Sequence, residues 1–510
     1  MMVLLRAPHL YGLFRILMVD VKKETISGAK WLLLQKCTVQ PLQFLYSMVL
    51  ARLITPAEMG IVGLTAVFFA VAVTLSSSGL GAALIRKLDR TDEDCDTMFW
   101  FNLGMSIIFA IALYSAAPWF VAFYNQPELL WLTRCSAFMM VLSSSAGVHW
   151  TLYSARRDFK TPAIIQSAAS IISMPVCLVL AYLGWGVWAL MCGTVTSSAV
   201  SLIAVWCVSP WKPRMRFSKV SFYELFGFGC KLTAASLLHT LYSHLRTFII
   251  GKFYSPADLG MYSKGARLAE LTPQTISSLL GSVTFPILAT LQNDKERLTS
   301  VYRKYIKVAT IPIAWGCVVM MALAKPMVGF CYGDAWLPCV IYVQIIACCL
   351  MFDHICIINL NLLNVIGRSD LILRLEIIKK FISILFVLYA ATISVTAICI
   401  SMAIYSQIAV FINSYYTGRY IGLTWLKQQK DYWPYIILSL FSVIPAFLLT
   451  LTKLPDIVVL FVGAVLSIVI YLFLLIYKKD GLLLELLQPL EKKVSFLKKP
   501  MSRISAWINR

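Results

Sequence analysis

Charged residues are scarce in this chain of 510 residues, and acidic residues are scarcer than basic ones. Asp, Glu, Lys and Arg make up 14% of the sequence, with 24 acidic and 45 basic residues. About 25% is usual for a soluble globular domain. Hydrophobic residues make up 59%, and the mean hydropathy is +0.78. This composition excludes a soluble domain and predicts an all-α polytopic membrane protein.

Catalytic motifs are also lacking. The sequence contains no phosphate-binding glycine loop and no HExxH motif, and its cysteines have no metal-ligand spacing. The dense acidic run 92–96 lies where a span is expected to begin, and a solvated helix start explains it. We therefore predict a transporter and not an enzyme, with no catalytic residue, metal or cofactor. Its energy would then come from an ion gradient, such as one of protons or sodium, from the membrane potential or from substrate consumption.

Long apolar runs dominate what remains. Fourteen of them are long enough to cross about 30 Å of hydrocarbon, which takes about 20 helical residues. The predicted transmembrane helices lie near 31–51, 60–85, 97–120, 129–150, 163–183, 186–208, 223–250, 260–288, 305–324, 337–362, 371–390, 394–416, 432–452 and 455–477. Cys331 and Cys339 flank one predicted outer loop, and both a disulfide and two buried thiols remain open there.

The basic charge of +21 follows membrane topology. With a cytoplasmic N-terminus, thirty-five of the 45 Lys and Arg fall in predicted cytoplasmic segments, and four fall in outer loops. This asymmetry is the positive-inside rule, and it predicts that both termini lie in the cytoplasm. It also argues against nucleic acid as a partner and favours contact with anionic membrane lipids.

A duplicated segment divides the chain. Pro56, Ala57 and Gly60 recur as Pro256, Ala257 and Gly260, and further identities continue without a gap to Gly281. Six spans separate the copies, so the repeat is parallel, as in many secondary transporters. The predicted domains are an amphipathic lead-in (1–30), an N-lobe of six spans (31–208), a cytoplasmic inter-lobe loop (209–222), a C-lobe of six spans (223–416), two extra C-terminal spans (432–477) and a basic amphipathic tail (478–510).

Once the basic residues counted with the loops are set aside, Lys379 among them, six remain within the predicted spans: Lys36, Arg134, Lys231, Arg246, Lys264 and Arg267. A cation at mid-bilayer costs about 2.5–3.5 kcal/mol, so those that lie deep must face a wet interior. Lys231, His239 and Arg246 fall within about an 80° arc of one helix. We therefore predict a cationic substrate site for anionic groups such as phosphate, formed by Arg246, Arg267, Lys231, Lys264, Lys36 and His239.

Structural explanations stay open for each of these residues. Lys36, Lys231 and Lys264 lie near span ends, where their side chains can extend to the interface. Arg267 has a potential ion-pair partner in Glu270, three residues on. Glu270 and Asp353 are the acids deepest in spans, and we predict them as candidates for proton or sodium coupling.

At this point the chain resembles the Wzx-type polysaccharide flippases of the multidrug/oligosaccharidyl-lipid/polysaccharide exporter superfamily. The resemblance covers about residues 25–480. Five segments, in this order and spacing, carry it: Leu53–Gly60, Phe123–Glu128, Ala155–Lys160, Gly184–Leu190 and Gly333–Pro338.

The resemblance implies a V-shaped bundle of two six-helix lobes in the bacterial inner membrane. It also implies flipping of undecaprenyl-diphosphate-linked oligosaccharide units to the outer leaflet by alternating access, for O-antigen, capsule or exopolysaccharide. A polysaccharide polymerase and glycosyltransferases would then be partners. Two alternatives share the fold: a peptidoglycan-precursor flippase and a drug or cation antiporter. The antiporter needs acidic and aromatic groups to hold cations, and the predicted cavity has the opposite charge.

Overall fold

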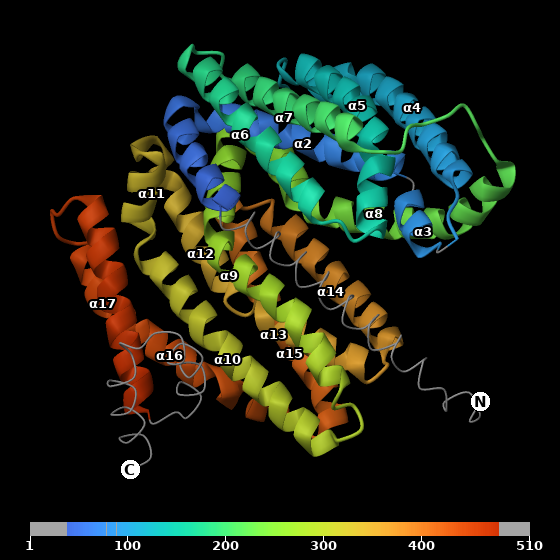
Figure 1. Cartoon of the computed structure of the whole chain (residues 1–510). Coiled ribbons are helices and arrows are strands. Elements are labelled where there is room, and N and C mark those ends of the chain that lie inside the picture. Colours follow the sequence, from blue (N-terminus) through green and yellow to red (C-terminus); the bar gives the residue numbers. More distant parts are fainter. Residues whose placement is uncertain (1–37, 78, 88, 479–510) are drawn as a thin grey trace, which may run out of the picture. The chain divides into compact units, whose positions relative to one another are not determined.

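The computed structural model describes residues 38–478, apart from residues 78 and 88. The described chain is helical, with only turns and short extended links between helices. It divides into two compact units, residues 1–257 and 258–510. Both are bundles of long helices (Figure 1). Ten helical segments are long and apolar enough to cross a membrane, which confirms the all-α membrane class; the count of fourteen spans stays a prediction.

Unit 1 opens with helical residues 38–53, and α2 packs against four later helices of the unit, α4, α5, α7 and α8. The helices of this unit are α2 (Pro56–Ser76), α3 (Leu80–Arg86), α4 (Asp92–Tyr124), α5 (Leu129–Ala155), α6 (Lys160–Tyr182), α7 (Val187–Val208) and α8 (Lys219–Phe253).

Helix α8 belongs to unit 1 by its packing. It contacts α2, α3 and α4, and its Leu225 joins the buried cluster around Leu80, Leu84 and Met98. The sequence repeat begins again near residue 223, whereas the compact unit ends at residue 257. Repeat and packing unit are therefore different divisions of the chain.

Unit 2 is organised around α10, which packs against α12, α13 and α16 and supplies much of the largest buried cluster. Its helices are α9 (Pro256–Ala289), α10 (Lys295–Ala322), α11 (Ala324–Tyr332), η2 (Asp334–Cys339), α12 (Val340–Leu350), α13 (Asp353–Val365), α14 (Ser369–Ala390), α15 (Val395–Ile421), α16 (Trp425–Leu449) and α17 (Asp456–Tyr477).

The duplicated motif builds a helix start in each unit. In unit 1, Thr55 caps α2: its hydroxyl accepts the Glu58 N–H, and its own N–H donates to Glu58 Oε2 at 2.8 Å. Pro56 occupies the first turn, where a missing N–H costs nothing. The second copy places Pro256 at the start of α9. Both copies of the motif therefore lie at the start of a long helix.

Two predicted spans depart from a single regular helix. The run 60–85 is split into α2 and α3, with Gly79 in the left-handed region at φ +63°. In the run 337–362, α12 passes into α13 through a turn at Met351 and Phe352, whose backbones keep right-handed helical angles.

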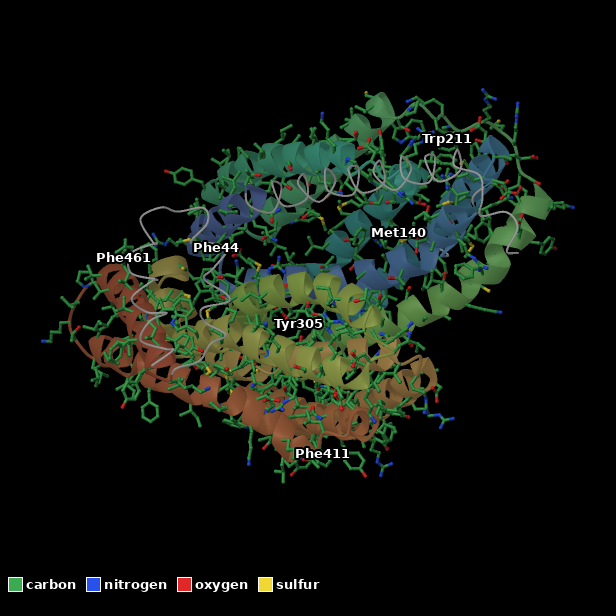
Figure 2. All side chains as sticks on the ribbon, turned by 60° about the horizontal axis from the view of Figure 1, so that its bottom comes forward. Phe44, Met140, Trp211, Tyr305, Phe411 and Phe461 are labelled. Atoms are coloured by element: carbon green, nitrogen blue, oxygen red, sulfur yellow. The ribbon has the colours of Figure 1, made fainter. Side chains whose placement is uncertain are left out.

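Large apolar side chains cover the outer surface of the bundles, as expected for contact with lipid. Figure 2 shows Phe411 on α15 and Phe461 on α17; Phe461 is 74% exposed.

Candidate functional site

Three long helices are too polar to count among the apolar spans: α8, α9 and α14. They carry most of the charges that the sequence places inside the membrane, including Lys231, Arg246, Lys264 and Arg267. A transmembrane helix that keeps such charges has a functional or packing reason for them. These helices are therefore where a site is sought.

Helix α8 runs without a break from Lys219 to Phe253, so the predicted common face of Lys231, His239 and Arg246 exists. Lys231 and His239 are exposed and Arg246 is half-buried. The only acid of α8 is Glu224 near its start, 2.9 Å from Lys87. The remaining length of this helix carries cations and two histidines, His239 and His244, and no acid.

Close backbone contact fixes this face relative to α2 and α3. The Thr74 and Thr240 hydroxyls lie 3.2 Å apart and join α2 to α8. At Gly79 a Cβ atom would lie 2.3 Å from the Gly229 carbonyl oxygen, so α3 and α8 approach too closely for a side chain. The α8 face is therefore held by the packing of unit 1.

The two predicted cations of helix α9 differ in their exposure. Lys264 is only 7% exposed, and its ammonium lies 5.1 Å from the Tyr332 ring centre and 5.9 Å from that of Trp336. Cation–π attraction of this kind stabilises a desolvated ammonium. Arg267 is exposed, and Glu270 is half-buried. Lys264 and Arg267 therefore lie within electrostatic range of each other but differ in burial.

Lys36 lies outside the described residues. Arg134, which the sequence also places in a span, lies over two aromatic rings, 4.5 Å from Tyr114 and 5.0 Å from Trp131. The predicted substrate-binding residues therefore fall into two described groups, one on α8 and one on α9, together with Lys36.

Lys379 is a residue that sequence reasoning missed. The count of loop charges assigns it to the cytoplasmic loop before the eleventh span, but it is the eleventh residue of the 22-residue helix α14. It is 4% exposed and forms an ion pair with Glu376, one turn earlier. Asp353 of α13 lies within electrostatic range of it. Its position nine residues inside the predicted span 371–390 was the signal that could have found it.

The acidic run 92–96 has buried partners, so its interpretation as a solvated helix start was wrong for two of its residues. Asp94 and Asp96 are fully buried. Asp94 pairs with Lys87 at 3.0 Å, and Asp96 Oδ1 accepts the backbone N–H of Arg214 at 3.0 Å. Glu224 and then Asp94 raise the pKa of Lys87 because both carboxylates favour its charged form.

The link between α7 and α8, residues 209–218, is held by the same helix start. Besides the Asp96 contact, the Thr97 hydroxyl accepts the Ser218 N–H at 3.0 Å, and the Trp100 indole N–H donates to the Arg214 carbonyl at 2.8 Å. His149 of α5 lies 2.8 Å from the Ser209 hydroxyl. This link is therefore docked on α4 and α5 along its length.

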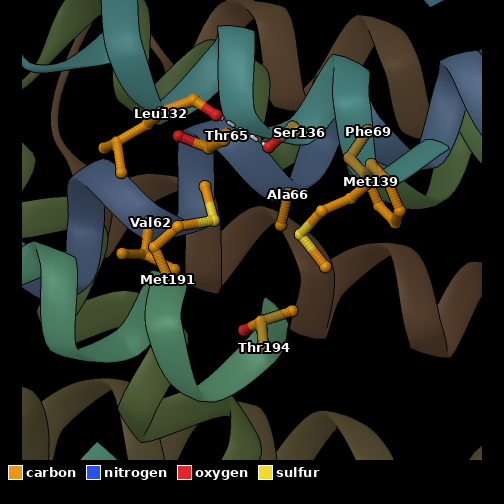
Figure 3. Close-up of a pocket in the computed structure, with 9 residues that line it drawn as sticks. All are labelled: Val62, Thr65, Ala66, Phe69, Leu132, Ser136, Met139, Met191 and Thr194. Atoms are coloured by element: carbon orange, nitrogen blue, oxygen red, sulfur yellow. Dashed lines mark hydrogen bonds between the residues drawn. The ribbon is translucent and has the colours of Figure 1, made fainter. Parts of the chain in front are cut away.

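A small pocket of about 100 Å³ lies in unit 1 between α2, α5 and α7 (Figure 3). Met139, Met191 and Phe69 make it mainly apolar, and the Ser136 hydroxyl is used in a 2.9 Å bond to the Leu132 carbonyl. Ligand sites usually enclose about 300–1,000 Å³. This pocket is too small and too apolar to hold a charged glycan.

Cys331 and Cys339 are both buried free thiols, which settles the question that the sequence left open between them. Among the described residues, no group of three or more His, Cys, Asp or Glu side chains is placed to hold a metal ion.

A sequence profile of the family described as "Polysaccharide biosynthesis protein" matches residues 49–341. The succinoglycan biosynthesis transport protein ExoT of Rhizobium meliloti is 24% identical over 314 residues, 62% of this chain and 64% of that protein. The lipopolysaccharide biosynthesis protein WzxC of Escherichia coli is 23% identical over 377 residues, 72% of this chain and 75% of that one. The chain thus spans just under two thirds of ExoT and three quarters of WzxC.

Among solved structures, the lipid II flippase MurJ in an inward closed conformation is similar with a TM-score of 0.69. The match covers 89% of this chain and 99% of MurJ at 13% identity. At that identity the likeness concerns the fold.

Proposed function

The chain belongs to the family of polysaccharide biosynthesis proteins, and from this premise we propose that it is a flippase. Its substrate would be an oligosaccharide repeat unit linked to undecaprenyl diphosphate. It moves that unit from the cytoplasmic to the outer leaflet by alternating access, and the product serves a surface polysaccharide. ExoT is named as a transport protein of succinoglycan biosynthesis, and WzxC is named as a protein of lipopolysaccharide biosynthesis.

The observation that carries the proposal is the cationic face of α8. Lys231 and Arg246 share it with His239, and the one acid of the helix is paired with Lys87 at the far end. A diphosphate offers several anionic oxygens, and a guanidinium binds two of them at once. Water exclusion around such a face strengthens the attraction. The face therefore fits a diphosphate better than it fits a neutral sugar or a cation.

Each predicted residue has a part in this proposal. Arg246 and Lys231 contact the diphosphate, His239 donates a hydrogen bond, and Arg267 and Lys36 add positive charge. Lys264, whose ammonium is enclosed by aromatic rings, attracts the diphosphate by its positive charge from a distance. The polyprenyl chain stays in lipid, since burying it in a cationic cavity would offer no gain.

Orientation, partners and energy complete the proposal. Both termini lie in the cytoplasm of a bacterial inner membrane, as the positive-inside rule requires. Glycosyltransferases supply the lipid-linked unit, and a polymerase consumes it. Coupling uses a proton or sodium gradient acting through Glu270 or Asp353, without a cofactor.

Peptidoglycan-precursor flipping is a second candidate, and the fold similarity to MurJ favours it. Both candidates carry the same lipid diphosphate, so the cationic face does not separate them. A drug or cation antiporter is disfavoured because cations would be repelled by that face.

Deletion of the gene in its host, with lipid-linked glycans assayed leaflet by leaflet, tests the function. We expect loss of surface polymer and repeat units trapped facing the cytoplasm; the trapped glycan identifies the substrate. Trapped peptidoglycan precursor would establish the second candidate. Units that reach the outer leaflet but stay unpolymerised would refute both.

A further inference from the structure

The link between α7 and α8 exposes side chains that the packing of unit 1 does not use. It runs along the outside of unit 1 (Figure 1). Met215 is 90% exposed, and Val220 in the first turn of α8 is 78% exposed. Three cations lie among these apolar side chains and are also exposed: Arg214, Arg216 and Lys219. Residues 214–223 therefore form a surface, here called the link surface, that is both apolar and cationic.

Backbone groups hold the link surface in place and leave its charged side chains exposed. The Arg214 N–H donates to Asp96, and the Arg214 carbonyl accepts from the Trp100 indole. The Ser218 N–H donates to the Thr97 hydroxyl. The guanidinium of Arg214 takes no part in these bonds. The path of the chain is thus fixed by α4, so a ligand that binds the side chains needs to order little of the backbone.

The three cations of the link surface form no ion pair within the part of the chain that the structure describes. The neighbouring carboxylates are used elsewhere, because Asp94 and Glu224 both bind the Lys87 ammonium. Lys212, the remaining basic residue of the link, has its ammonium 5.6 Å from the ring centre of Trp206. Arg214, Arg216 and Lys219 are therefore available to an anion from outside the chain.

The other charged groups at this end of unit 1 leave the balance positive. Residues 86–96, 155–160 and 209–224 contain the neighbouring helix ends, and they carry ten cations and seven acids. Two of these acids, Asp94 and Asp96, are fully buried. Asp89, Asp92 and Glu93 are exposed, but they too form no ion pair with the cations of the link surface. A surface with this excess of positive charge attracts anions.

Tryptophan side chains mark the level of this surface in the membrane. Around Phe99, the ring centres of Trp100, Trp206 and Trp211 lie 5.3, 6.3 and 6.0 Å from its own. Tryptophan is enriched where the hydrocarbon meets the headgroups. The apolar helix α7, 22 residues long, ends at Val208, immediately before the link. Both observations place the link at the membrane interface.

From these contacts we propose that the link surface binds anionic phospholipids of the cytoplasmic leaflet. Arg214, Arg216 and Lys219 contact the phosphate groups of the headgroups, to which an anionic leaflet attracts basic side chains. Met215 and Val220 enter the boundary between headgroups and acyl chains, as apolar side chains of interfacial segments do.

A lipid surface fits these side chains better than an acidic protein partner does. The apolar and cationic groups alternate over ten residues at the level of the interface, where lipids offer acyl chains and phosphates side by side. The choice of leaflet follows from the positive-inside rule. The anchoring itself goes beyond the proposed function, because it does not depend on which substrate the protein carries.

Hydrogen–deuterium exchange of the full chain in nanodiscs tests this contact without any glycan. One set of discs contains phosphatidylcholine alone, and the other contains equal parts of phosphatidylcholine and phosphatidylglycerol. We expect the peptide that covers residues 212–220 to exchange several-fold more slowly in the anionic discs. Residues 290–300 supply the control peptide, because they are mostly exposed but carry two cations and two acids. Their exchange should be equal in both lipids.

Two variants show which groups make the contact. The triple variant Arg214→Gln, Arg216→Gln, Lys219→Gln should lose the difference between the two lipids. The double variant Arg214→Lys, Arg216→Lys keeps the charge and should retain the difference, which also controls for folding. Equal exchange of the unmodified protein in both lipids would overturn the inference and leave the link surface to a protein partner. A difference that survived in the glutamine variant would overturn the role of these cations. Neither result bears on the flippase proposal, because the deletion experiment tests that independently.

Discussion

Whether a charged side chain is buried or exposed determines its role in this protein, as the carboxylate of Asp96 shows. Its carboxylate accepts the Arg214 N–H at 3.0 Å and is fully buried, so it fixes the link between α7 and α8. We predict that Asp96→Ala releases this link, because an anchoring hydrogen bond to a charged group contributes about 1.5–3 kcal/mol. Exposed Arg214 and Arg216 would then be cut by trypsin several-fold faster in a limited-proteolysis time course.

Asp92→Ala is the control for this experiment. Asp92 lies at the same helix start but is exposed. Equal cleavage rates in the two variants would show that the Asp96 contact does not hold the link.

For single residues, the sequence predicted the chemical type of a side chain better than it predicted the groups that surround that side chain. It identified Lys264 and Asp353 as membrane-embedded charges but did not place Lys264 in a cage of aromatic rings. Those rings come from Tyr332 and Trp336, about seventy residues on in the chain. Lys379 was missed because a count of loop charges does not register depth along a helix. Burial depends on tertiary partners, which periodicity does not specify.

At the scale of helices, close crossings limit which residues are tolerated, and the contact of α3 with α8 at Gly79 is one of these close crossings. We predict that Gly79→Ala is destabilising for two reasons: a left-handed backbone with a side chain costs about 1–2 kcal/mol, and the new Cβ meets the Gly229 carbonyl oxygen at 2.3 Å. The expected result is a lower midpoint of thermal unfolding in detergent, followed by intrinsic fluorescence.

Gly104→Ala is the matched control. Gly104 lies inside α4, and a Cβ there would meet nothing within 4 Å. Alanine favours helix over glycine by about 0.8–1 kcal/mol, so this variant should be neutral or slightly more stable. A Gly79→Ala protein as stable as the Gly104→Ala protein would contradict the close approach of α3 and α8.

The helices themselves were largely predictable, and their interruptions were not. The capping motif at Thr55 and Pro56 predicts the start of α2, and the repeated Pro256 predicts the start of α9. No proline or glycine marks the turn at Met351 and Phe352, since the run 337–362 reads as one apolar span. Tertiary packing of α12 and α13 against α10 and α15 accompanies that turn. The sequence alone therefore did not reveal the turn before Asp353.

For the whole molecule, composition and charge asymmetry predicted a helical membrane protein with a cationic interior, and the described helices agree on the class. The arrangement of the interior did not follow, because the expected cations that the structure describes have unequal environments. Lys231 and Arg267 are exposed, Arg246 is half-buried and Lys264 is enclosed. A substrate site is thus better sought among the accessible cations than among all six.

Joint neutralisation of Lys231, Arg246 and Arg267 to glutamine tests that view. Each charge-assisted hydrogen bond to a diphosphate is worth about 1.5–3 kcal/mol, and about 1.4 kcal/mol is tenfold in affinity. We therefore expect export of surface polysaccharide to fall at least about tenfold at equal protein level in the membrane. The measurement is complementation of the deletion strain, with protein quantified by immunoblot.

The control removes the same charge elsewhere. Lys295, Arg297 and Lys427 are exposed near the starts of α10 and α16, and their joint change to glutamine should leave export near its original level. If both triple variants lost export equally, net charge or topology would be responsible, because the positive-inside bias acts on insertion. If the first triple variant exported normally, these cations would have no part in holding the diphosphate. Only a selective loss would assign a role in export to these three cations.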